Sequence, residues 1–136
     1  MSWTGSSFAQ QTEYLIRHYD IEDGLPVNTV NGILQDAEGY LYASTYDGLV
    51  RFDGYNFEVY NTGNANGMLT NRLAGMLEAS DSTLWLFNEG GTITSKKGSK
   101  FRTYTIAELP GEITRIIQNS DGRIWVGGTK GIAYYS

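Results

Sequence analysis

A chain of 136 residues, 40% of them hydrophobic and 13% aromatic, is long and apolar enough for one domain with a packed core. Its net charge of −5 argues against nucleic-acid binding and against docking on anionic lipid, because both need clustered Lys and Arg. The absence of cysteine excludes disulfides, thiol catalysis and thiolate metal sites. No apolar run approaches the roughly 18–20 residues that cross a bilayer, so we expect no membrane insertion of this segment.

The chain opens with a polar stretch, residues 1–11, which we expect to be a flexible tail ahead of a folded region over residues 12–136. Residues 14–20 combine aromatic and β-branched side chains and predict an extended strand. Gly24-Leu25-Pro26 then predict a turn, since Gly and Pro interrupt regular structure.

Residues 27–60 predict a unit of four short strands joined by tight turns. Asp47-Gly48 and Asp53-Gly54 separate alternating apolar runs, and such pairs favour hairpins because glycine accepts the positive φ that these turns require. The expected strands are residues 29–35, 40–45, 49–52 and 57–60. Four antiparallel strands in so short a unit are typical of a β-propeller blade.

This unit recurs twice further along the chain. Tyr42, Trp85 and Trp125 take the same place in successive copies and lie 43 and 40 residues apart, a spacing typical of propeller repeats. The second copy covers residues 70–105, with strands expected at 73–77, 83–87, 92–94 and 101–104; the third covers residues 111–136, with strands expected at 113–117, 123–127 and 132–135. The predicted fold is all-β, with about three blades' worth of strands.

Two groups of side chains in these copies have structural interpretations. The three central aromatic residues, and Ile33, Met76 and Ile116 in the preceding strands, are expected to pack in the core between blades. The basic run from Lys96 to Lys100 is expected to be a solvated hairpin tip rather than an anion site.

The third copy has three strands, and the strand predicted at residues 14–20 matches the pattern of the fourth strands at 57–60 and 101–104. We therefore expect one blade to be split between the two ends of the chain. Three blades are too few to close a ring, since propellers have roughly four to eight. Either the chain is the front of a longer propeller, or a homodimer completes six blades by exchanging the strand at residues 14–20.

The repeats resemble the two-component regulator propeller family. The first copy matches that family at Gly24-Leu25-Pro26, Asn28, Val30, Ile33, Gln35-Asp36, Gly39, Leu41, Thr45 and Gly48-Leu49. The third copy matches at Gln118, Asp121-Gly122, Ile124-Trp125-Val126-Gly127, Thr129 and Gly131-Ile132. The first copy departs by placing Tyr42 where the family has tryptophan. The second departs further, with Ser82 in place of the turn glycine.

The resemblance implies a non-catalytic sensor input module of a bacterial signalling receptor. Such propellers lie on the periplasmic or extracellular side of the inner membrane, ahead of a histidine kinase or diguanylate cyclase output domain. A propeller enzyme (a lyase or hydrolase) and a protein–protein adaptor are the alternatives, since fold alone does not settle function.

Propeller ligands usually meet the face that carries the loops from the fourth strand to the next blade and from the second strand to the third. In this chain those loops hold the candidate ligand-binding residues Asn28, Tyr46, Asp47, Asn71, Arg72, Asn88, Glu89, Glu112, Arg115 and Lys130. Mixed polar residues with an aromatic suit a polar small molecule, an oligosaccharide or a peptide. The same residues also suit solvated loops, which are polar in any case.

We expect no catalytic residue, no metal site and no cofactor. His18 is the only histidine, and it falls in the predicted outer strand. Acidic residues recur at the turns, namely Asp36, Glu38, Asp53, Asp81 and Asp121. Because these residues recur at turns of successive copies, we expect their side chains to brace the turns rather than to bind a metal ion.

Overall fold

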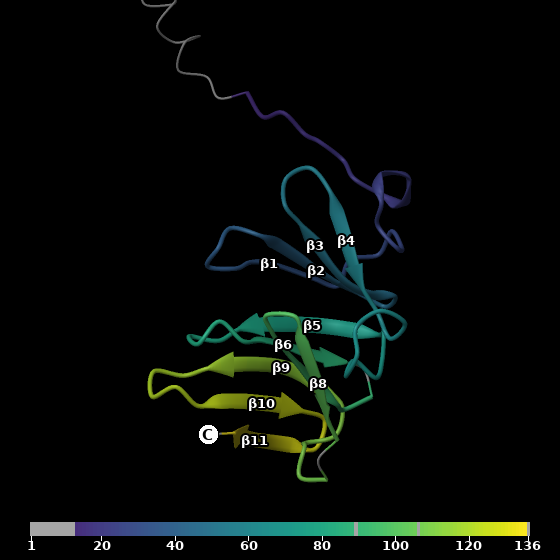
Figure 1. Cartoon of the computed structure of the whole chain (residues 1–136). Coiled ribbons are helices and arrows are strands. Elements are labelled where there is room, and N and C mark those ends of the chain that lie inside the picture. Colours follow the sequence, from purple (N-terminus) through teal and green to yellow (C-terminus); the bar gives the residue numbers. More distant parts are fainter. Residues whose placement is uncertain (1–12, 89, 106, 136) are drawn as a thin grey trace, which may run out of the picture.

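The computed structural model describes residues 13–88, 90–105 and 107–135. Within them the chain forms three antiparallel sheets stacked face to face, one after another along the sequence (Figure 1). Each sheet is a propeller blade, so the predicted all-β propeller fold is confirmed. The helical structure among the described residues is a single 3₁₀ turn, η1 (Ile21–Asp23), and no described helix is long and apolar enough to cross a membrane.

The blades share one strand order, in which each strand pairs with the next. Blade 1 comprises β1 (Gly32–Gln35), β2 (Leu41–Thr45), β3 (Gly48–Phe52) and β4 (Phe57–Tyr60). Blade 2 comprises β5 (Leu73–Glu78), β6 (Leu84–Asn88), β7 (Ile93–Lys97) and β8 (Lys100–Tyr104). Blade 3 comprises β9 (Ile113–Gln118), β10 (Ile124–Gly128) and β11 (Gly131–Tyr135). The outer edge of β11 has no partner strand among the described residues.

Strand alternation gives each blade two apolar faces, and these form two core clusters. The first lies between blades 1 and 2 and is built around Tyr42, Leu49, Leu73, Leu84 and Leu86. The second lies between blades 2 and 3 and is built around Phe87, Ile93, Ile113, Ile116 and Val126. Because side chains alternate along a strand, consecutive residues Leu86 and Phe87 serve different clusters.

The turns between first and second strands follow the repeat closely. Gly39 and Gly122 adopt positive φ of 97° and 89°, as their turns require. Ser82 takes the same place in blade 2 with φ of 70° and is the one described non-glycine residue with positive φ. Such backbone costs an L-residue roughly 1–2 kcal/mol, so blade 2 carries local strain that its neighbours avoid.

The turn aspartates brace the backbone, as predicted. The Oδ1 atoms of Asp36, Asp53, Asp81 and Asp121 each accept a backbone N–H two residues further on, at distances from 2.8 to 3.2 Å. Glu38 makes no such bond, and no described group of acidic or histidine side chains has the arrangement of a metal site.

The strand predicted over residues 14–20 is not formed, which corrects that expectation. Tyr14 and Leu15 are 87% and 81% exposed, and no described strand pairs with this segment. An extended segment becomes a strand only through a partner's hydrogen bonds, and this chain offers none beside it. Tyr19, at the end of the segment, instead packs against the rings of Phe52 and Phe57 at centroid distances of 5.2 and 5.6 Å.

Two expectations about burial were also wrong. Ile33 was predicted to be in the core but is 70% exposed, because its face of blade 1 has no neighbouring blade among the described residues. Lys96 was predicted to lie in a solvated hairpin tip but is only 8% exposed. The reason is that β7 continues through Lys97, which places Lys96 on the inner face of blade 2.

Candidate functional site

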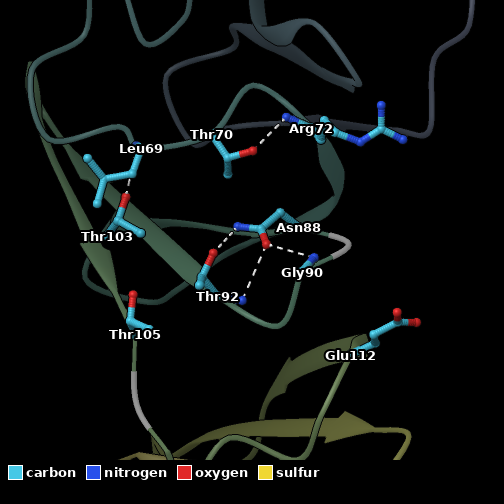
Figure 2. Close-up of a pocket in the computed structure, with 9 residues that line it drawn as sticks. All are labelled: Leu69, Thr70, Arg72, Asn88, Gly90, Thr92, Thr103, Thr105 and Glu112. Atoms are coloured by element: carbon cyan, nitrogen blue, oxygen red, sulfur yellow. Dashed lines mark hydrogen bonds between the residues drawn. The ribbon is translucent and has the colours of Figure 1, made fainter.

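The loops that join β2 to β3, β6 to β7 and β10 to β11 open on the same side of the propeller as the links that lead into β1, β5 and β9. On this loop face a cavity of about 490 Å³ opens beside blade 2 (Figure 2). Its lining comprises Leu69, Thr70, Arg72, Asn88, Gly90, Thr92, Thr103, Thr105 and Glu112. Of the predicted site residues, the cavity therefore brings together Arg72, Asn88 and Glu112.

Asn88 shapes the cavity rather than presenting free polar groups to it. The side chain is only 2% exposed. Its Oδ1 accepts the backbone N–H groups of Gly90 and Thr92, and its Nδ2 donates to the Thr92 Oγ1 (Figure 2). In blade 1 the equivalent Thr45 makes the same kind of brace, donating to the Gly48 carbonyl oxygen at 2.8 Å. Asn88 is thus mainly a turn residue.

Arg72 and Tyr46 form a cationic and aromatic pair at the junction of blades 1 and 2. The Arg72 guanidinium lies 4.5 Å from the centroid of the Tyr46 ring, within the range of a cation–π interaction. The Tyr46 side chain is 38% exposed, so the pair lies at the surface. The backbone N–H of Arg72 donates to the Thr70 Oγ1 at 3.1 Å, which fixes the start of β5.

The wall formed by β8 and the link into β5 is held by Thr103. Its Oγ1 donates to the Gly67 carbonyl oxygen at 2.8 Å and accepts the Leu69 N–H at 3.3 Å. Gly67 has a φ of 99°, and a Cβ there would lie 1.9 Å from the Phe101 carbonyl oxygen, so only glycine allows this approach. The link is consequently packed against blade 2 and forms a firm wall for the cavity.

Glu112 bounds the cavity on the side of blade 3. Its backbone N–H donates to the Thr129 Oγ1 at 3.1 Å, and its carbonyl oxygen accepts the Thr129 N–H at 3.0 Å. The main chain is thereby fixed to the β10–β11 turn, while the side chain is exposed. Among the described residues, the cavity lining thus includes one guanidinium group, one exposed carboxylate and four threonine hydroxyl groups.

The remaining predicted residues lie elsewhere. Asn28 and Asn71 serve the backbone, since their Oδ1 atoms accept the N–H groups of Ile21 at 3.1 Å and Thr62 at 2.8 Å. Asp47 and Lys130 occupy the equivalent turns of blades 1 and 3 and do not line the cavity.

Arg115 was assigned to a loop, but it lies within β9 and lines a different cavity formed with residues of β1 and β5. Glu89 falls outside the described residues.

Sequence reasoning missed the threonines of the cavity, Thr70, Thr92, Thr103 and Thr105. Threonine is common in strands, so a threonine at a strand end carries no distinct signal. His18, predicted to have no catalytic role, lies in the segment before η1 with its side chain 82% exposed.

The fold and this geometry define a segment of a β-propeller with a polar loop-face cavity. The model of the "Two component regulator propeller" family matches residues 24–47 and 108–130, that is, parts of the first and third copies. Two stretches of the chain therefore match the repeat of this family, and the resemblance drawn from its motifs is confirmed.

Individual proteins are similar to parts or most of the chain. Over 52 residues the chain is 38% identical to histidine kinase P4 of Formosa agariphila, a stretch that covers 38% of this chain and 4% of that protein. The extracellular domain of the hybrid two-component system BT3049 of B. thetaiotaomicron matches with a TM-score of 0.76 and 24% identity, covering 91% of this chain and 18% of that one. The chain thus spans a small part of these relatives.

A propeller enzyme shares the fold as well. A catalytically inactive virginiamycin B lyase from Staphylococcus aureus matches with a TM-score of 0.61 and 17% identity, covering 83% of this chain and 43% of that one. At these identities the solved structures establish the fold alone.

Proposed function

We propose that the chain is part of a non-catalytic sensor input propeller of a bacterial two-component-type receptor, exposed on the periplasmic or extracellular side of the inner membrane. The observation that carries this proposal is the pairing of the family's repeats with a polar cavity on the loop face. The extracellular two-component domains among the similar structures support the class and the location.

The proposed ligand is a polar small molecule, an oligosaccharide or a peptide that occupies the loop-face cavity. Hydroxyl groups can hydrogen-bond a polyhydroxylated or amide-bearing ligand, while Arg72 and Glu112 orient it by charge. The firm walls at Asn88 and Thr103 support this proposal, because a cavity that is formed in advance costs less ordering on binding.

Calorimetric titration of oligosaccharide and peptide panels tests the proposal. Thr105→Val and Glu112→Gln should each weaken binding about 3- to 10-fold, the cost of about one hydrogen bond. Ser99→Ala, in the β7–β8 turn on the opposite side, is the matched control and should bind normally. Equal binding by all three variants would place the ligand elsewhere, and binding of peptides alone would favour an adaptor.

The enzyme alternative has one specific observation in its favour, the lyase among the similar structures. A lyase or hydrolase needs a convergent acid and base, whereas among the described residues the ionisable side chains lining this cavity are Arg72 and Glu112. Turnover of any ligand found in the titrations, abolished by Glu112→Gln, would favour the enzyme.

We further propose that a second copy covers the open faces of blades 1 and 3. Large apolar side chains are exposed on both: Val30 and Ile33 on one, and Ile117, Ile132 and Tyr134 on the other. The segment at residues 14–20 would then add the fourth strand to blade 3 of the partner. In blades 1 and 2 the third and fourth strands pair Val50 with Val59 and Thr94 with Thr103. Ala133 takes the place of Val50 and Thr94 in the repeat, and His18 takes that of Val59 and Thr103, so the exchange would place His18 opposite Ala133.

Cross-linking tests this exchange directly, because the chain has no cysteine. His18→Cys mixed with Ala133→Cys should give a disulfide-linked dimer, whereas either variant alone should not. Light scattering should report a dimer of the unmodified chain. A monomer without cross-links would contradict the exchange and leave both faces to further blades of a longer polypeptide.

A further inference from the structure

Lys96 is a buried lysine without a carboxylate partner. It lies on the face of blade 2 that packs against blade 1, and it is only 8% exposed. Its Nζ donates to the Gly98 carbonyl oxygen at 2.8 Å and lies 3.5 Å from the Tyr42 hydroxyl oxygen. No ion pair among the described residues includes it. Lysines are almost never buried to this degree unless a charge pairs with them.

The fold does not require a lysine at this point. Lys96 pairs with the first residue of β6. In the other two blades, the residues in the same place are Phe52, which pairs with the first residue of β2, and Tyr135, which pairs with the first residue of β10. The repeat thus uses an aromatic side chain in blades 1 and 3. Blade 2 has an ammonium group there instead, at a desolvation cost that packing does not explain.

Aromatic rings surround this ammonium. Its Nζ lies 5.5 Å from the Tyr42 ring centroid, 5.3 Å from that of Tyr60 and 5.8 Å from that of Phe101, all within cation–π range. The rings favour the charged form but carry no net charge that could neutralise it. Burial lowers the pKa of Lys96 and the nearby Arg51 lowers it further, whereas Asp36, Glu58 and Glu38 raise it in part. Because the balance is a lowered pKa, an anion in contact with the ammonium would stabilise its charged form.

A cavity of about 490 Å³ opens beside Lys96, between blades 1 and 2. It is bounded by the β1–β2 turn and the β7–β8 turn, on the side of the propeller opposite the loop face. Arg51 lines it too, and its Nη2 donates to the Glu58 Oε2 at 2.8 Å. A guanidinium has five donors, so this bond leaves others for a ligand. These two cations and the Glu58 carboxylate leave an excess of positive charge on this wall.

The β1–β2 turn and β5 supply carboxylates to the same cavity. Glu78 accepts the Ala37 N–H at 3.2 Å, and Asp36 accepts two backbone N–H groups of its turn. The Glu38 side chain has no hydrogen bond or ion pair among the described residues. The cavity therefore offers an unmatched cation on one side and an uncommitted carboxylate on another.

We propose that this cavity binds a zwitterion of the amino-acid class, with the ligand's carboxylate on Lys96 and Arg51 and its ammonium toward Glu38. A ligand with both charges pairs with both sets of groups. A ligand with only a negative charge would be repelled by the acidic side chains, and one with only a positive charge would be repelled by Lys96. The site is independent of the loop-face cavity, so either proposal can fail while the other stands.

Three matched probes test the charge requirement by calorimetric titration: L-alanine, N-acetyl-L-alanine and L-alanine methyl ester. L-Alanine should bind, and the other two should bind at least about tenfold more weakly, because each lacks one charge. No binding of L-alanine at millimolar concentration would overturn the proposal. Equal binding of L-alanine and N-acetyl-L-alanine would overturn the zwitterion in favour of an anion.

Substitutions of Lys96 separate binding from folding. Lys96→Met should abolish L-alanine binding, and Lys96→Phe, which restores the repeat's aromatic residue, should do so while raising the melting temperature. Two substitutions cover the case in which one variant fails to fold. Lys100→Met is the control, since Lys100 is exposed at the start of β8 and does not line this cavity, and its binding should be unchanged.

Glu38→Gln tests the other end of the ligand. It should weaken L-alanine at least about threefold and leave N-acetyl-L-alanine unchanged, because only L-alanine carries the ammonium. Unchanged L-alanine binding in Lys96→Met, with the fold intact by circular dichroism, would assign Lys96 a purely structural role and contradict the site.

Discussion

Blade 2 and its two neighbours are built on one repeat, yet they differ where the repeat is most constrained. Blades 1 and 3 have glycine at the first turn, at Gly39 and Gly122, and an aromatic residue, Phe52 or Tyr135, opposite the first residue of the second strand. Blade 2 has Ser82 with positive φ at that turn and Lys96 at that register position. The departures cost stability locally, and both of them line the cavity between blades 1 and 2. In this chain, the copy that departs furthest from the repeat is the one whose departures line a second cavity.

The largest expected effect comes from Leu86, which is fully buried between blades 1 and 2 and which blade 1 replaces by Ala43. Leu86→Ala should lower the free energy of unfolding by about 2–5 kcal/mol, because it leaves a cavity in the first core cluster. Urea denaturation measures the change. A loss below about 1 kcal/mol would mean that the interface between blades 1 and 2 is not the rigid core described.

The next effect concerns the alkaline limit of the same interface. Burial raises the pKa of Tyr60 from 10.0 to about 12, against the opposing effect of Arg51. The unfolded phenol loses its proton above pH 10 and the folded one only near pH 12, so the folded state holds more protons in this window. This contribution to stability is present below pH 10 and is lost as the pH rises from 10 to about 12. Tyr60→Phe should show a smaller loss in urea titrations across that window, and equal losses would contradict the burial.

A smaller, stabilising effect is expected at the strained turn. Ser82→Gly should raise the free energy of unfolding by about 1 kcal/mol, because glycine adopts positive φ without steric cost. Gly122→Ser in blade 3 is the reciprocal change and should lower it by a similar amount. Thermal melting of the two variants measures both. Equal melting temperatures would show that the turn glycine of the repeat has no energetic role.

The smallest effect is expected at the surface of blade 2. Lys97 and Asp81 pair at 3.4 Å with side chains 64% and 60% exposed. Lys97→Met should change the free energy of unfolding by less than about 0.5 kcal/mol, as exposed ion pairs contribute little. Urea denaturation at low and high salt checks this, and a loss above about 1 kcal/mol would indicate that the pair is coupled to Lys96.

The strands were predictable because alternation and Gly turns are local signals. All eleven described strands match predicted ones, and the fold follows from the repeat. The burial of Lys96 was not predicted because its charge was taken to indicate exposure. Thr94 and Lys96 lie on the same face of β7, so extending the predicted strand from residue 94 to residue 96 would have predicted the burial. The strand predicted at residues 14–20 is not formed, because a strand needs the hydrogen bonds of a neighbouring strand and no described strand pairs with this segment. The loop-face cavity depends on how Gly67 and Thr103 join the link to blade 2, a contact between distant segments.

Backbone amide mapping by nuclear magnetic resonance tests the central claim, that the loop face is a ligand site, most directly. A ligand from the oligosaccharide or peptide panels should shift the amide signals of Thr70, Thr92, Thr105 and Glu112 and leave those of the β1–β2 turn at Asp36 and Glu38 unchanged. L-Alanine should give the reverse pattern. Shifts confined to the open faces of blades 1 and 3, with none at the loop-face cavity, would contradict the sensor site and favour an adaptor surface.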